Sequence, residues 1–246
     1  MGGPPPVPTI DIARLLADIA LATTDETLAS SAAAQAVART SARYDAVMSI
    51  GGTVGMPPAA FSAGGNQPGS VANPLTMDQA QALYDEFKAQ TDRIPFDYPR
   101  DGCFARAHEM CRMMEEKGMQ CGKVWNYGNL SVPGTPLGDI TWGYHVAPII
   151  NVRQPDGSVV AMVMDPSMAP PNGPVPITST PPDNSGWTNR QNDSGSYTDT
   201  TDSSPFYYHP NGNAGLTIPD TDNSRTEAVL EHFQIMRDLV YAGKAP

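Results

Sequence analysis

Asp101-Gly102-Cys103-Phe104-Ala105-Arg106-Ala107-His108 is the stretch that decides the fold of this chain. The segment before it, residues 94–99, carries two prolines and is predicted to be extended, because proline cannot continue a helix. Apolar residues then recur at three- and four-residue steps, namely Phe104, Ala107, Cys111 and Met114. This spacing predicts a helix that has Asp101 as its N-cap and stops at Gly118, so Cys103 would lie in its first turn.

A cysteine at the start of a helix is a candidate nucleophile. A thiol attacks poorly at neutral pH until its pKa falls, and the partial positive charge of the free N–H groups at a helix start lowers that pKa. The same N–H groups can stabilise an oxyanion, and Gly102 would let a substrate approach closely. The alternative for Cys103 is a buried, inert, apolar cysteine.

A predicted hairpin supplies partners for this thiol. The residues around Asp156-Gly157 are a turn signal between two strands. With the turn centred there, Ala147 faces Asp165, and His145 is the diagonal neighbour of Asp165 on the same face of the sheet. A histidine base oriented by an aspartate is the pair that a thiol nucleophile needs. The alternative is a core histidine beside an aspartate that ends a strand.

The rest of the chain divides into two predicted parts. Residues 1–72 are predicted to be a helical appendage, with helices at 10–21 and 25–48 and a Gly/Pro/Ala-rich linker from 51. Residues 73–246 are predicted to be the main domain. Its expected elements are a helix at 77–91 with Thr76 as N-cap, the Cys103 helix, strands at 124–130, 142–152 and 158–165, long loops over 166–220, and a helix at 225–242. This order of helices and meandering strands predicts the α+β class.

Composition excludes several classes of function. The chain has 246 residues and a formal charge of −11, which argues against nucleic acid as a partner, because phosphate binding needs Lys and Arg. No apolar run is long enough to span a bilayer, so no membrane partner is expected. The N-terminus lacks the charged and apolar regions of a signal peptide.

Three cysteines cannot form a disulfide framework, and their odd number leaves at least one free thiol. A zinc site could be drawn from Cys103, His108, Cys111 and Cys121, but the spacing is not of the paired C-x-x-C type. His108 is expected to point away from the first turn of the helix, and His209 and His232 have no partner that the sequence reveals.

The stretch 94–108 resembles the nucleophile region of the bacterial protein-glutaminases, which are protein-glutamine deamidases. Further similar segments follow in the same order: Tyr127-Gly128-Asn129-Leu130, Trp142-Gly143-Tyr144-His145-Val146-Ala147, Asp165-Pro166-Ser167 and, more weakly, Tyr207–Pro210 and Val229–Phe233. The likeness covers about residues 74 to 240.

The resemblance implies a Cys-His-Asp triad on a papain- and transglutaminase-like core, with the nucleophile at a helix N-terminus packed on an antiparallel sheet. Cys103 would be the nucleophile, His145 the general base and acid, and Asp165 the residue that orients the imidazole. The implied reaction hydrolyses the side-chain amide of glutamine in proteins that expose it, without a metal or organic cofactor. Candidates for the wall around the glutamine methylenes are Trp142, Tyr144 and Tyr127.

The chain also departs from that family. It has fewer cysteines and no recognisable leader, which suggests a secreted or delivered effector or toxin, with a cognate inhibitor or immunity protein as a further partner; a cytoplasmic protein is the alternative. Residues 1–72 would then be an inhibitory segment, a delivery region or part of a larger protein. Papain-type proteases carry a glutamine six residues before the nucleophile, where this chain has Asp97. A cysteine protease or transglutaminase with the same triad, and a non-enzymatic binding module, remain the competing functions.

Overall fold

The computed structural model describes residues 32–49, 53–55, 61, 65–135, 137–168, 171–179, 183, 185–191, 196–211 and 214–242. The helices are α2 (Ala32–Ser49), α3 (Met77–Lys88), α4 (Cys103–Glu116) and α5 (Ser224–Ala242), with short 3-10 turns at Pro166–Met168 and Thr188–Gln191. The strands are β1 (Thr53–Gly55), β2 (Leu75–Thr76), β3 (Gly122–Thr135), β4 (Gly138–Arg153), β5 (Val159–Val163), β6 (Val175–Pro176), β7 (Tyr197–Asp202), β8 (Pro205–Asn211) and β9 (Ala214–Pro219).

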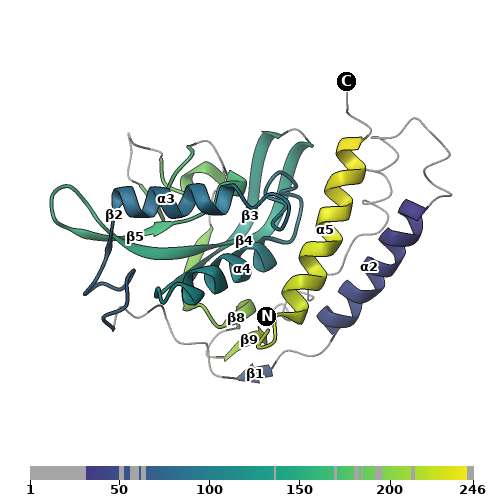
Figure 1. Cartoon of the computed structure of the whole chain (residues 1–246), viewed down its shortest axis with the longest axis horizontal. Coiled ribbons are helices and arrows are strands. Elements are labelled where there is room, and N and C mark those ends of the chain that lie inside the picture. The colour runs from purple at the N-terminus through teal and green to yellow at the C-terminus, as the bar shows by residue number, and fades with distance from the viewer. Residues whose placement is uncertain are drawn as a thin grey trace.

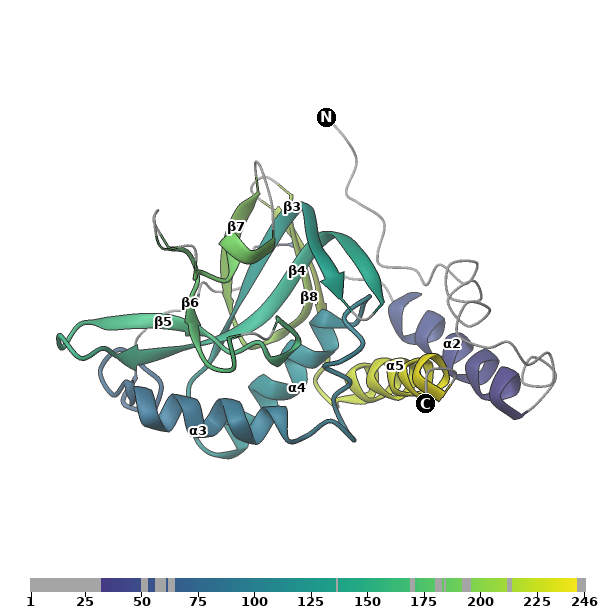
Figure 2. The same cartoon turned by 90° about the horizontal axis from the view of Figure 1, so that it is seen from above.

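Two sheets and the helices around them make up the molecule (Figure 1). The larger sheet has the order β6-β5-β4-β3-β7, and β2 pairs in parallel with β4; its other pairings are antiparallel. The smaller sheet is antiparallel, with the order β1-β9-β8. Figures 1 and 2 show α3 and α4 on one face of the larger sheet, and α4 also contacts β8. This mixture of helices and antiparallel sheet confirms the predicted α+β class.

The N-terminus of α4 differs from the prediction by one residue. The N-cap is Gly102 rather than Asp101, and Gly102 has a left-handed backbone with φ 78°. Asp101 caps this turn from outside the helix, because its Oδ1 accepts the Gly102 N–H at 2.6 Å. Cys103 is therefore the first residue of the helix.

Two other predicted helix ends are confirmed. Thr76 caps α3 through a capping box with Gln79, in which each side chain bonds the backbone N–H of the other residue. At the end of α4, Gly118 has φ 70° and the Met119 N–H donates to the Met114 carbonyl at 2.9 Å. That bond is part of a Schellman motif, which explains why the helix stops at this glycine.

The β4–β5 hairpin has the predicted register. Ile149 pairs with Val163, and beyond the end of β5 the Met164 N–H donates to the Pro148 carbonyl at 2.9 Å. Gly157 takes φ 85° in the connecting turn, a conformation that residues other than glycine rarely adopt. Since side chains alternate along a strand, this register decides which residues share a face.

The prediction of long loops over residues 166–220 is wrong for much of that region, because β6, β7, β8 and β9 lie within it. These strands are short and contain many polar residues or prolines, so they lack the alternation that marks a strand. Their pairing depends on distant partners: β7 completes one edge of the larger sheet beside β3, and β9 pairs with β1.

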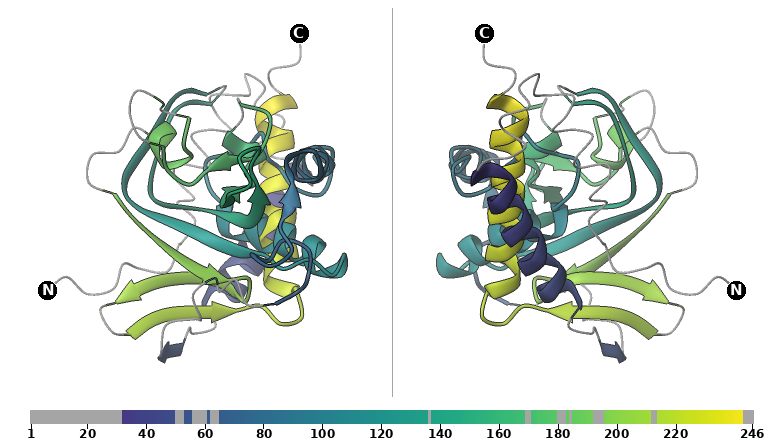
Figure 3. Two further views of the ribbon diagram at one scale, coloured as in Figure 1. Left: turned by 90° about the vertical axis from the view of Figure 1, so that its left-hand side faces the viewer. Right: turned by 90° about the vertical axis from the view of Figure 1, so that its right-hand side faces the viewer.

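The N-terminal region packs on the rest of the molecule. In the right-hand view of Figure 3, α2 lies along α5, and Arg43 forms an ion pair with Glu231 at 2.6 Å. Tyr44 is fully buried against Phe233. β1 lies in the stretch predicted to be a linker, whereas the helix predicted at 10–21 lies outside the described residues.

Buried apolar side chains from the sheets and the helices form one large core, which includes Cys103, and a smaller second cluster includes Ala147 and Trp187. Among the described residues, no helix combines the length and the apolar character that crossing a bilayer demands.

Candidate active site

Cys103 sits where α4 begins and is almost inaccessible, with 5% of its surface exposed. Its thiol contacts the backbone N–H of Val146, the residue after His145. Burial raises the pKa of the Cys103 thiol to about 12, although Arg106 and the Val146 N–H act in the opposite direction. Desolvation of the thiolate is the largest cause, so the net shift is upward and not the downward shift expected for a thiol at a helix start. The thiol is protonated at neutral pH.

His145 and Asp165 form a buried pair. His145 Nε2 lies 2.8 Å from Asp165 Oδ2, and both side chains are buried. The imidazole thus donates its Nε2–H to the carboxylate, which leaves the Nδ1 lone pair available. This buried Nδ1 has no hydrogen-bond partner among the described residues. An imidazole held in this tautomer is equipped to accept a proton at Nδ1.

The Asp165 carboxylate is held on both oxygens. Oδ2 also accepts the indole N–H of Trp187 at 2.8 Å, while Oδ1 accepts the backbone N–H of Ser167 at 3.1 Å and its hydroxyl at 2.5 Å. Burial alone would raise the pKa of Asp165, but the electrostatic interaction with His145 and these hydrogen bonds together lower it to about 2. The carboxylate is therefore ionised over the whole neutral range.

Two indoles enclose the His145 ring. Trp142 stacks on one side with a centroid distance of 5.2 Å and an interplanar angle of 12°, and Trp187 stacks at 5.2 Å and 25°. The Trp142 N–H is shared between the carbonyls of Pro99, at 3.0 Å, and Arg100, at 3.1 Å. Trp142 thereby joins the histidine to the segment that leads into Cys103.

Sequence reasoning missed Trp187, which lies in the region expected to be loops. One signal was available. The chain has only three tryptophans, and a large aromatic side chain in an otherwise polar segment is usually buried against the rest of the protein.

The two predicted tyrosines lie at different depths. The Tyr144 hydroxyl is buried without a partner among the described residues, and its pKa is raised by burial and next by the nearby Cys103. Tyr127 stacks on Tyr144 with a centroid distance of 6.2 Å and donates its hydroxyl to the Tyr208 carbonyl at 2.7 Å. Tyr144 is thus close to the thiol, and Tyr127 supports Tyr144 from the side.

The other histidines have structural partners. His108 Nδ1 lies 2.8 Å from the Lys123 ammonium and its Nε2 lies 3.3 Å from the Asp220 carbonyl, so it does not bind the cysteines. His232 Nδ1 accepts the Thr40 hydroxyl at 2.9 Å. In the part of the chain that the structure describes, no three His, Cys, Asp or Glu side chains gather as a metal site would require.

Comparisons with known proteins bear on the same region. A family model described as glutaminase matches residues 80–179, which include Cys103, His145 and Asp165. A search of the curated proteins finds no match.

Solved structures of protein-glutaminase resemble the fold. One crystal structure of protein-glutaminase is 26% identical, with a TM-score of 0.53 over 63% of this chain and 85% of that one. A mutant of pro-protein-glutaminase is 26% identical, with a TM-score of 0.55 over 74% of this chain and 62% of that one. A pro-protein-glutaminase is 28% identical, with a TM-score of 0.53 over 66% of this chain and 60% of that one. The chain thus spans about three fifths of the two pro-proteins.

The family model and the similar solved structures together support a glutaminase, an enzyme of the hydrolase class. More particularly, the solved structures that the chain resembles are structures of protein-glutaminase.

Proposed function

We propose that this enzyme hydrolyses the side-chain amide of glutamine residues in protein substrates, with Cys103 as nucleophile, His145 as general base and acid, and Asp165 as the group that orients His145. The observation that carries this proposal is that Nδ1 of His145 has no hydrogen-bond partner in the part of the chain that the structure describes. The Nε2 of the same ring is held by Asp165, and the next residue, Val146, contacts the Cys103 thiol.

The proposed chemistry begins from a neutral thiol. As Cys103 Sγ attacks the amide carbon, its proton passes to His145 Nδ1. The oxyanion that forms would be stabilised by free backbone N–H groups at the start of α4. His145 then gives its proton to the leaving nitrogen, so that ammonia departs and a thioester remains. Water that gives a proton to His145 attacks the thioester, and glutamate and the thiol are restored.

We propose that Trp142, Tyr144 and Tyr127 form the wall around the glutamine methylenes. Tyr144 would contact the substrate, since its hydroxyl is unpartnered among the described residues and lies near Cys103. Tyr127 would act through Tyr144, on which it stacks, because its own hydroxyl is already bonded to Tyr208.

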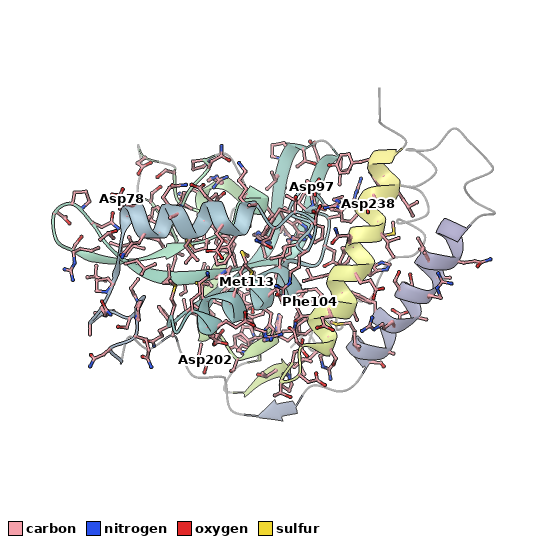
Figure 4. The ribbon with its side chains drawn as sticks, viewed as in Figure 1. Asp78, Asp97, Phe104, Met113, Asp202 and Asp238 are labelled. Atoms are coloured by element: carbon pink, nitrogen blue, oxygen red, sulfur yellow. The ribbon has the colours of Figure 1, made fainter. Side chains whose placement is uncertain are left out.

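The competing protease and transglutaminase reactions would use the same thioester. Papain-type proteases need an oxyanion donor at the position of Asp97, but Asp97 is exposed and lies 3.9 Å from Arg237 on α5 (Figure 4). A carboxylate cannot donate a hydrogen bond to an oxyanion when it is ionised. This observation favours amide hydrolysis at a side chain over peptide cleavage.

We propose that residues 73–246 form the catalytic domain around a papain- and transglutaminase-like core, and that residues 1–72 are an appendage. We further propose delivery as an effector or toxin, with a cognate inhibitor or immunity protein. The free state of all three cysteines supports this idea, since structural disulfides do not persist in the reducing interior of a recipient cell.

The test is ammonia release from a glutamine-rich protein, with mass spectrometry to locate Gln→Glu conversion. We expect release by the natural chain and a loss of about 1,000-fold or more in Cys103→Ala and His145→Ala, because each removes a group that touches the reacting atoms. Cys111→Ala is the matched control, since it removes a cysteine from the same helix outside the site, and it should keep its activity.

Three results would reject the proposal or part of it. Equal ammonia release by Cys103→Ala would exclude this nucleophile, and no release from any protein substrate would exclude the reaction. Cleaved chains, or amine incorporation that outpaces deamidation, would select the protease or the transglutaminase.

A further inference from the structure

Cys111 and Cys121 form a second thiol site, apart from Cys103. Cys111 lies on α4, two turns beyond Cys103, and Cys121 comes just before β3. The Cys121 thiol donates to the Cys111 carbonyl at 3.6 Å, and the Cys111 thiol donates to the Gly122 carbonyl at 3.6 Å. The two thiols also interact electrostatically, so their sulfur atoms lie near each other.

The two thiols differ in access. A cavity of about 420 Å³ opens beside the end of α4, and Cys121 lines it together with Gln67, Met119 and Gln120. Cys111 is not part of this lining and is 1% exposed. A small molecule that enters the cavity therefore reaches Cys121 first, and Cys111 stands behind it.

The charges around the pair favour a particular kind of reagent. Glu115 and Asp202 both line the cavity, and Figure 4 shows Asp202 below α4, where β7 ends. These carboxylates repel an anionic reagent and attract a cationic one. The interaction with Cys111 and burial raise the pKa of the Cys121 thiol, and the buried Lys123 side chain nearby acts in the opposite direction.

We infer that Cys111 and Cys121 are a redox pair that a small neutral or cationic disulfide oxidises to an intramolecular disulfide. The Cys121 thiolate attacks one sulfur of R–S–S–R, which forms a mixed disulfide and releases RS⁻, and RS⁻ takes up a proton. The Cys111 sulfur then attacks the Cys121 sulfur and releases a second RSH. The protein loses two electrons and two thiol protons, and the reagent gains them. The product joins α4, whose first residue is Cys103, to the start of β3.

Peptide mapping tests this inference without any assay of deamidation. Trypsin separates the three cysteines into the peptides 101–106, 107–112 and 118–123, because each is bounded by Lys or Arg. The full chain is incubated with cystamine at pH 8, denatured, alkylated with iodoacetamide and digested without reduction. We expect peptide 107–112 linked to peptide 118–123, with the link lost on reduction, while 101–106 is recovered alkylated. Cystamine should react at least about tenfold faster than the anionic oxidised glutathione.

Two variants sharpen the test. Cys111→Ala should trap Cys121 as a mixed disulfide with cysteamine, because the resolving thiol is gone. Cys103→Ala should still give the linked pair. Recovery of both Cys111 and Cys121 in alkylated form, or a link from either of them to Cys103, would overturn the inference. Oxidised glutathione reacting as fast as cystamine would overturn the assignment of the reagent's charge.

Discussion

The Trp187 indole makes two contacts that act on one imidazole. Its N–H bonds Asp165 Oδ2 at 2.8 Å, and its ring stacks on His145. The indole therefore fixes the carboxylate and limits rotation of the histidine at the same time. In the proposed reaction Trp187 is a positioning residue, since it acts through Asp165 and His145 and not on the substrate.

Replacing Trp187 with Phe separates the two contacts, because phenylalanine keeps an aromatic face but has no N–H. Loss of this hydrogen bond raises the pKa of Asp165, since the bond favours the ionised form. We expect kcat/KM to fall about tenfold, which corresponds to about 1.4 kcal/mol for a bond to a charged group. The acid limb of the pH–rate profile should move to higher pH, as measured by ammonia release between pH 4 and 8.

Trp125→Phe is the matched control. Trp125 also donates a buried indole N–H, to the Thr201 hydroxyl at 3.0 Å, but it does not contact Asp165. Trp125→Phe should lose about as much stability as Trp187→Phe, but the acid limb of its pH–rate profile should not shift. An unshifted limb in Trp187→Phe as well would mean that Trp187 has only a packing role.

Some residues of the candidate site could be predicted from the sequence, and others could not. His145 and Asp165 could be paired because a short turn sets the register of their strands, and the residue types in a turn predict its geometry. Trp187 reaches them from 22 residues beyond Asp165, over a path without periodicity. The pKa of Cys103 was mispredicted because burial is a property of the packed molecule and not of a helix start.

Among the elements, the first turn of α4 depends on Gly102. Its backbone is left-handed, and a Cβ built there would lie 2.6 Å from the Phe233 ring of α5. Figure 4 shows the beginning of α4, at Phe104, next to α5. The position of Cys103 is thus fixed both by a backbone that suits glycine and by close contact with another helix.

Gly102→Ala should displace this turn. The left-handed backbone and the clash together should cost about 1–3 kcal/mol of stability, and ammonia release should fall at least about tenfold because Cys103 moves. Gly118→Ala separates the two effects, since Gly118 has φ 70° but, among the residues that the structure describes, no atom lies within 4 Å of its Cβ position. That variant should lose stability, measured by urea denaturation, and keep its activity. Full activity in Gly102→Ala would show that the turn adjusts.

The elements divide into predictable and unpredictable ones for a physical reason. α3, α4 and the β4–β5 hairpin carry their own signals, namely caps, helical spacing and an Asp-Gly turn. β7, β8 and β9 carry few, because they exist through pairing with β3 and β1 far away in the chain. Strand formation of this kind is decided by neighbours more than by propensity.

For the molecule as a whole, buried neutral histidines make stability depend on acid. Burial is the main cause that lowers the pKa of His108 to about 3 and of His232 to about 4, from an ordinary value of 6.5. Below pH 6.5 these two histidines therefore bind protons in the unfolded chain, whereas in the folded chain they stay neutral until the pH is much lower. The stability that these groups contribute is complete above pH 6.5 and is lost as the pH falls through about 4 to 3. Asp165 acts in the same direction between 3.8 and about 2.

We therefore expect the free energy of unfolding to fall steadily below pH 6.5, by up to about 1.4 kcal/mol per pH unit for each histidine. Urea denaturation at pH 7.0, 5.5 and 4.5 measures this slope. His232→Gln should reduce the slope by the share of one group, because glutamine does not titrate. A stability that is constant from pH 6.5 to 4.5 would contradict the burial of these histidines in neutral form.

The pairings at the two ends of the described chain have a consequence for how the protein is made. β1, at residues 53–55, pairs with β9, at 214–219, and α2 lies along α5. Neither contact can form on the ribosome until the last elements have emerged, at about 5–20 residues per second. During that interval α5 is not available to pack against the apolar side of α2. We therefore expect chaperones to bind α2 at this stage. Such distant pairings also slow the folding of the released chain, since loop closure comes before any gain from contact.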